Sequence, residues 1–238
     1  MNEKQLFDPA RPVARPEAGL SRYTARAFLW MALGLLVTFG VSVGGYLVEL
    51  PYRLFMLHPY TIFVITGLEL VLVIVLSAKL HALPIPAAVT LFLGYAVLNG
   101  IVFSTYFYLY DLTGVILVFG VTAVYFAAMA LFGFFTSADL SRLRNILLGG
   151  LIFLVVFGLV SIFIPNLGML ERIVCLAGVA VFMGFTAYDT QKIKALYYGF
   201  QGDDAMLARA SIFSALQLYL DFINLFLYLL RFLGKRKN

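Results

Sequence analysis

The chain has 238 residues, of which 63% are hydrophobic and only 12% are charged, and its formal net charge is +5. A soluble domain carries about 25% charged residues, so this chain has too few charges to cover a globule in water. The basic residues lie mostly between apolar runs, where they orient a membrane protein rather than bind nucleic acid. The composition therefore predicts an integral membrane protein that is surrounded by the lipid bilayer.

The first 26 residues are polar and basic, contain three prolines, and lack the apolar centre of a signal peptide. They are predicted to form a flexible cytoplasmic arm, 1–26. Seven apolar runs follow, and each is interpreted as one spanning helix: 27–48, 60–78, 87–110, 112–138, 145–170, 173–188 and 210–230. Together they make an all-α transmembrane domain, 27–231, which a basic tail, 232–238, follows. Asp203 or Asp204 is expected to cap the last helix.

Lysine and arginine gather in the cytoplasmic loops of membrane proteins, and this bias sets the predicted orientation. With the N-terminus in the cytoplasm, only Arg53 and Arg172 fall in outer loops. The tail departs from the rule, because seven spans place its basic residues outside. A re-entrant last segment would return the tail to the cytoplasm, but seven full spans are favoured. Short loops and a compact size indicate a bacterial inner membrane.

Three carboxylates lie inside apolar runs, where an ionised group is costly and usually functional: Glu69, Asp189 and Asp221. Glu69 either lines a cation path or only hydrogen-bonds a neighbouring helix. Asp221 belongs to a polar stripe with spacings of 3, 4, 3 and 4 residues: Ser214, Gln217, Asp221, Asn224 and Tyr228. Such a stripe on a helix in lipid faces the protein interior, so Gln217 and Asn224 join Glu69 as candidates for a cation path. The alternative is a polar seam that only joins helices.

Asp189 and Asp221 are both reached from the cytoplasmic side, because their helices are consecutive and antiparallel. They meet only if the last helix tilts or begins outside the membrane, and the sequence permits this without proving it. If they meet, burial favours one proton shared by the two carboxyl groups. Without that proton the two anions repel, or accept a cation such as calcium. The pair is a candidate proton sensor, gate and calcium site, and the alternative is two aspartates with separate hydrogen bonds.

Paired aspartates in membrane helices also suggest an intramembrane aspartyl protease. Such an enzyme usually carries a Gly-x-Gly-Asp turn, whereas Asp221 follows Leu218, Tyr219 and Leu220, and no glycine there admits a substrate backbone. The chain is therefore predicted not to be an enzyme. No cofactor is expected, and calcium enters only as a transported ion or a ligand.

Two segments resemble signatures of the Bax inhibitor (TMBIM) family. The segment 188–193 reads Tyr-Asp-Thr-Gln-Lys-Ile and resembles the sixth-helix signature, and 215–231 resembles that of the last helix. The resemblance implies a seven-helix bundle with a central last helix. It also implies that Asp189 and Asp221 correspond to the two acids of the bacterial members, which are described as pH-sensitive calcium leak channels. It further implies a basic latch, for which Lys79 is the matching candidate, and an acid in the second helix, which Glu69 matches.

Two functions are compatible with these features. The first is a pH-sensitive calcium (cation) leak channel, gated by protonation of the aspartate pair. The second is a membrane-embedded regulator that binds a membrane protease or a stress-pathway partner. Some bacterial members of the family resemble regulators of a membrane-bound protease. The basic arm discriminates between them, because its deletion would impair binding of a partner but spare calcium flux.

Overall fold

The protein is all-α in the computed structural model, which describes residues 18–56, 58, 60–78, 83–161, 163–164, 167–235 and 237. Six helical segments of the described chain are long and apolar enough to cross a membrane: α2 (Ala18–Leu47), α4 with α5 (Ile85–Phe103 and Tyr106–Leu109), α6 (Leu112–Phe135), η2 with α7 (Leu140–Leu143 and Arg144–Ser161), α8 (Met169–Gly199) and α9 (Asp204–Leu233). Helix α3 (Thr61–Ala78) is a further apolar helix. The predicted all-α membrane protein is confirmed, and α3 brings the helices to the expected seven.

The first helix begins earlier than its apolar run. Helix α2 starts at Ala18 rather than near residue 27, so residues 18–26 are helical and do not belong to a flexible arm. Tyr23, Ala27 and Met31 follow at intervals of four residues on one face, and all three side chains are buried. Burial of that face explains why the helix extends into a segment whose composition is polar.

The last three spans also differ in length from the predicted runs. Helix α7 ends at Ser161, well before residue 170, whereas α8 continues past residue 188 to Gly199. The segment after Asp189 is rich in residues that favour helices and contains no glycine or proline before Gly199. The helix therefore continues after the apolar run has ended. Helix α9 starts at Asp204, and the Oδ1 atom of Asp203 accepts a hydrogen bond from the backbone N of Met206 at 2.9 Å. Asp203 is therefore the cap that the sequence predicted.

The chain divides into two compact units, which are described separately. Unit 1 comprises Thr113–Gly199, Leu220–Lys235 and the start of the chain as far as Leu20, and so contains most of α6, all of α7 and α8, and the second half of α9. Unit 2 comprises Ser21–Leu112, Phe200–Tyr219 and the last three residues. Each unit therefore holds half of α9. The apolar stretch of α9 is 67% buried, against 33% or less in the other spans, which confirms the central last helix.

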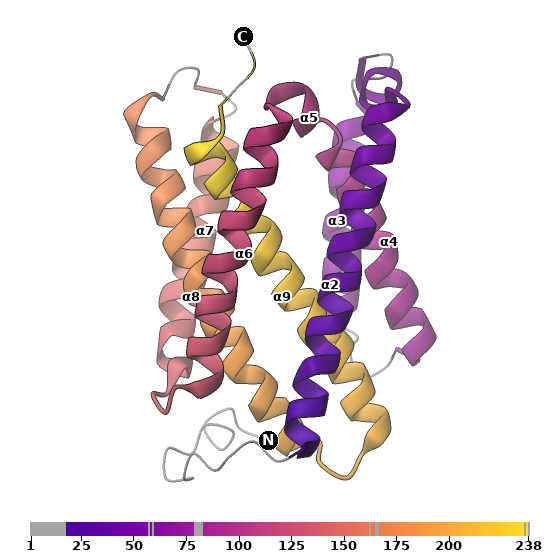
Figure 1. Ribbon diagram of the computed structural model, residues 1–238, viewed down its shortest axis with the longest axis vertical. Coiled ribbons are helices and arrows are strands. Elements are labelled where there is room, and N and C mark those ends of the chain that lie inside the picture. Colours follow the sequence, from indigo (N-terminus) through magenta and orange to yellow (C-terminus); the bar gives the residue numbers. More distant parts are fainter. Residues whose placement is uncertain are drawn as a thin grey trace. The chain divides into compact units, whose positions relative to one another are not determined.

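Helices α6, α7, α8 and the second half of α9 form unit 1 (Figure 1), and glycines allow some of them to approach closely. A Cβ atom at Gly133 of α6 would lie 2.8 Å from the Cα atom of Ala187 in α8. Gly178 of α8 faces the ring of Tyr228 in α9 in the same way. Away from these contacts, Phe222 of α9 packs edge-on against aromatic rings of α6, with ring centroids 5.2 and 5.4 Å apart. Small residues thus allow the close packing expected of helices in lipid.

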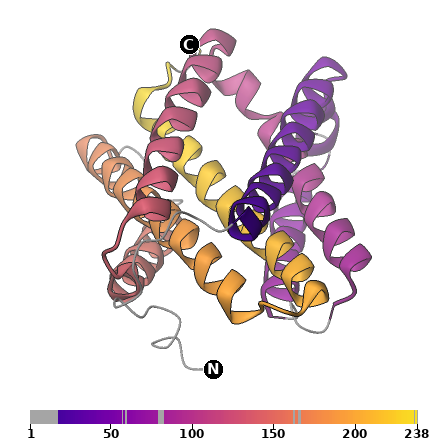
Figure 2. The same cartoon turned by 60° about the horizontal axis from the view of Figure 1, so that its bottom comes forward.

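In unit 2, α3 and α4 lie side by side (Figure 2). The hydroxyl of Thr38 in α2 donates to the carbonyl oxygen of Ala96 in α4 at 2.9 Å, and lies 2.6 Å from the hydroxyl of Tyr219 in α9. Because the proton of Thr38 goes to Ala96, Tyr219 donates to Thr38. One hydroxyl pair therefore connects three helices of this unit.

The tail meets unit 2 at the connection between α4 and α6. The backbone N of Lys237 donates to the carbonyl oxygen of Leu109 at 3.0 Å, and its Nζ donates to that of Phe107 at 3.0 Å. Helix α9 is continuous over 30 residues, a length of about 45 Å that exceeds the hydrocarbon thickness of about 30 Å. The unbroken helix therefore favours a full span over the re-entrant alternative for the last segment.

Candidate functional site

Asp189 of α8 and Asp221 of α9 lie together in unit 1. Both side chains are buried, with 7% and 4% of their surface exposed, and their carboxyl groups are hydrogen-bonded to each other. A hydrogen bond between two carboxyl groups requires that one of them carries a proton, because an ionised carboxylate has no donor. The structure thus brings together the two carboxyl groups whose contact the sequence left open, and a hydrogen bond between them is possible only while the pair holds a proton.

The lengths of the two helices explain how this contact forms. Asp189 lies 10 residues before the end of α8 (199 − 189), whereas Asp221 lies 17 residues after the start of α9 (221 − 204). Straight antiparallel neighbours would keep these positions roughly 10 Å apart along the axis, since each residue adds about 1.5 Å. The contact therefore requires that one helix is tilted or shifted along the other, in line with the condition that the last helix tilts or begins outside the membrane.

The surroundings of the pair offer few other donors. Thr186 and Thr190 donate their hydroxyl protons to carbonyl oxygens of their own helix, at 2.8 and 2.7 Å. The Oδ2 atom of Asp221 is buried and accepts no hydrogen bond from the described residues. Lys192, which is half-buried, acts electrostatically on both carboxyl groups. Among the described residues, Lys192 is thus a cation whose charge acts on both members of the pair.

Gln191 and Lys194, which follow Asp189 in α8, hold the connection after α6 against α8. The Nε2 atom of Gln191 donates to the carbonyl oxygen of Ala138 at 2.7 Å, and its Oε1 accepts from the backbone N of Leu140 at 3.0 Å. Lys194 donates from Nζ to the carbonyl oxygen of Phe134 at 2.6 Å. Neither Gln191 nor Lys194 was predicted from the sequence to have this role. A polar amide inside the family signature was the only signal that could have indicated this clamp.

The residues predicted to line a cation path occupy both units. Glu69 of α3 lies in unit 2, where it acts electrostatically on Tyr95 and Tyr219, and its buried Oε1 accepts no hydrogen bond from the described residues. Gln217 is half-buried in the first half of α9, and the amide of Asn224 donates to the carbonyl oxygen of its own helix at 2.8 Å. The path that these three residues were expected to form stays a prediction. Lys79, the expected latch, lies outside the described residues.

The donor set of the pair bears on the predicted calcium site. Among the described residues, no three side chains of the His, Cys, Asp and Glu types gather as metal ligands. Calcium takes six to eight oxygen ligands, so two aspartates would supply a minority of them. Carbonyl oxygens and water would have to supply the rest, and a calcium site at the pair stays a prediction.

Comparisons with known proteins give a consistent result over nearly the whole chain. The family model described as "Inhibitor of apoptosis-promoting Bax1" matches residues 20–238. The chain is 39% identical over 235 residues to the inner membrane protein YbhL of Escherichia coli K12, covering 97% of this chain and 99% of that one. It is 40% identical over 209 residues to a protein of Deinococcus radiodurans, and 33% over 218 residues to one of Borreliella burgdorferi. These matches cover 87% and 92% of this chain, and 88% and 94% of the relatives.

Proposed function

The chain belongs to the family of inhibitors of apoptosis-promoting Bax1, and we propose that it is a pH-sensitive leak channel for calcium or a similar cation. Its proposed location is a bacterial inner membrane with the N-terminus in the cytoplasm, as the described location of its E. coli relative supports. The observation that carries the proposal is the hydrogen bond between the buried carboxyl groups of Asp189 and Asp221. A proton buried between two spanning helices is a natural sensor of pH.

The proposed gate works through the packing of α8 against the second half of α9. With the shared proton, the carboxyl groups attract each other by a hydrogen bond. Without it, two like charges in a poorly solvated interior repel by an energy on the order of a few kcal/mol, which the nearby positive charge of Lys192 reduces. A change of that size is enough to shift a two-state equilibrium by about 100-fold. In this proposal Glu69, Gln217 and Asn224 line the path that the shift opens or closes.

The test is calcium flux in proteoliposomes, measured with a trapped fluorescent indicator at pH values on both sides of neutrality. The Asp189→Asn and Asp221→Asn variants keep the shape of the side chain but cannot titrate, so their flux is expected to lose its pH dependence. Asp203→Asn is the matched control, because Asn caps a helix as well as Asp does and the residue is exposed. Its pH response should equal that of the unmodified protein.

Two outcomes would overturn the proposal in different ways. A normal pH response in both aspartate variants would refute the sensor while leaving the channel. Absence of calcium flux from the unmodified protein at every pH would refute the channel and favour the regulator of a membrane partner. Deletion of residues 1–17 then tests the regulator, and this truncation keeps α2 whole, whereas removal of the full predicted arm would cut into it.

A further inference from the structure

A cavity of about 200 Å³ lies among α7, α8 and α9 in unit 1. Its floor is apolar and buried, and includes Leu154, Val174 and Cys175, each with 5% or less of its surface exposed. Its rim carries two exposed groups of opposite charge, Glu171 of α8 and Arg231 of α9. An apolar floor below a rim with one negative and one positive side chain is suited to a small zwitterionic ligand.

The two charged groups line the same cavity and act on the same residue of its floor. Glu171 and Arg231 both act electrostatically on the Cys175 thiol in the floor. The guanidinium carbon of Arg231 lies 5.8 Å from the ring centroid of Tyr228, which also lines the cavity. Arginine has five N–H donors in a planar fork, so it can serve a phosphate group alongside other partners. A carboxylate such as that of Glu171 accepts hydrogen bonds from a primary ammonium group.

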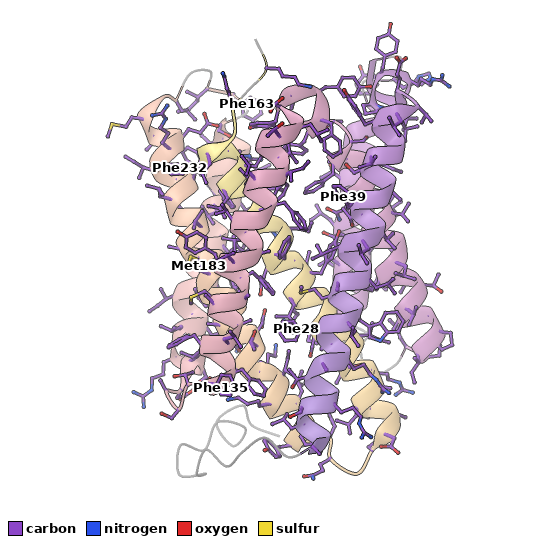
Figure 3. The ribbon with its side chains drawn as sticks, viewed as in Figure 1. Phe28, Phe39, Phe135, Phe163, Met183 and Phe232 are labelled. Carbon is purple, nitrogen blue, oxygen red and sulfur yellow. The ribbon has the colours of Figure 1, made fainter. Side chains whose placement is uncertain are left out.

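The cavity lies at the level that lipid headgroups occupy in a bilayer. Glu171 lies in the first turn of α8, Arg231 in the last turn of α9, and Ser161 of the cavity wall ends α7. The ends of spanning helices lie at the level of the polar headgroups. Phe163, just after α7, marks this end of unit 1, and Phe135, at the end of α6, marks the opposite end (Figure 3). The apolar stretch that contains α7 is only 11% buried, so its outer face is available to acyl chains.

From this geometry we propose that the cavity binds the headgroup of a zwitterionic phospholipid with a primary amine, as in phosphatidylethanolamine. Arg231 holds the phosphate, Glu171 accepts from the ammonium, and the acyl chains lie along α7. Phosphatidylglycerol has no cation to meet Glu171, and the quaternary nitrogen of phosphatidylcholine has no N–H to donate. The volume is below the roughly 300–1,000 Å³ of pockets for drug-sized ligands, which agrees with a headgroup and not a whole molecule as the occupant.

The first experiment is native mass spectrometry of the full-length protein in detergent, titrated with each of the three lipids. The unmodified protein should retain phosphatidylethanolamine most strongly. Glu171→Gln should weaken phosphatidylethanolamine binding roughly tenfold and leave phosphatidylglycerol unchanged, whereas Arg231→Gln should weaken both. Arg172→Gln is the matched control, because this exposed residue adjoins Glu171 but does not line the cavity.

A second pair of variants tests the cavity without changing any charge. Gly158 lines the cavity, and a Cβ atom there would meet no atom within 4 Å, so Gly158→Leu should fill the space without a clash. Gly149 of the same helix has equally open surroundings but does not line the cavity, and Gly149→Leu should bind lipid normally. Loss of phosphatidylethanolamine binding in the Gly158 variant alone would support the site even if Arg231→Gln failed to fold.

Three results would overturn the proposal. Equal retention of the three lipids by the unmodified protein would remove the selectivity for a primary amine. Equal binding by the Gly158→Leu and Gly149→Leu variants would place the lipid elsewhere. Binding of soluble glycerophosphoethanolamine as tightly as the lipid would make the ligand a free metabolite rather than a membrane component. Because these experiments measure lipid binding, they do not depend on the channel activity proposed above.

Discussion

The close approach of α6 to α8 at Gly133 is expected to control the position of Asp189. An Ala at this position adds a Cβ atom 2.8 Å from both the Cα and the carbonyl carbon of Ala187, and the carbonyl oxygen lies nearer still. Ordinary contacts of a Cβ atom begin at 3.4 Å, so the helices must separate by at least 0.6 Å (3.4 − 2.8). Ala187 is two residues from Asp189, so this separation also displaces the aspartate.

The size of the effect follows from two opposing terms. Overpacking of a helix contact costs about 1–3 kcal/mol, and backbone atoms cannot rotate away as a side chain would. Replacement of Gly by Ala in a helix contributes about 0.5–1 kcal/mol of stability in the other direction. Gly120→Ala is the matched control in the same helix, because a Cβ atom at Gly120 meets nothing within 4 Å. The difference between the two variants therefore isolates the overpacking, at about 1–3 kcal/mol.

The single cysteine provides the assay. Cys175 is buried in α8, so a thiol-reactive fluorescent dye reports the unfolding of the detergent-solubilised protein during heating. Gly133→Ala should unfold at a lower temperature than the unmodified protein, and Gly120→Ala at the same or a higher one. In proteoliposomes, only the Gly133 variant should alter the pH response of calcium flux. An unfolding temperature for Gly133→Ala equal to that of Gly120→Ala would refute the reasoning.

Two further substitutions test the hydrogen bonds that organise each unit, with the same dye assay. Gln191→Leu should destabilise the protein by about 2–4 kcal/mol, because two hydrogen bonds are lost and the backbone N–H of Leu140 stays buried without its acceptor. Gln191→Glu, which still accepts from Leu140, should recover part of this loss, and equal stability of the two variants would contradict the clamp. Thr38→Val should cost about 1–2 kcal/mol, because its hydroxyl joins α2 to two other helices, α4 and α9. Thr122→Val, buried to the same degree but bonded only within its own helix, should cost less, and the reverse order would argue against the bridge.

Much of the fold was predictable from the sequence because a bilayer imposes simple rules on helices. Runs of about 20 apolar residues must span as helices, and the described chain has six helices long and apolar enough to do so, with α3 as a further apolar helix. The polar stripe on the last span was correctly assigned to the interior, since Ser214 and Asp221 are buried and Gln217, Asn224 and Tyr228 are half-buried. The helix ends were less predictable. Helix α8 continues beyond its apolar run to Gly199, because helical propensity and packing, rather than hydropathy, decide where a helix stops.

The sequence by itself thus determined a seven-helix membrane protein with two aspartates in its last two spans, because hydropathy and residue type are local properties. Only the tertiary structure decided that Asp189 and Asp221 lie together, since their contact depends on how packing sets two long helices against each other. The same holds for the clamp at Gln191, which joins residues more than 50 positions apart. It also holds for Glu171 and Arg231, 60 positions apart, whose charges the fold places at the rim of one cavity.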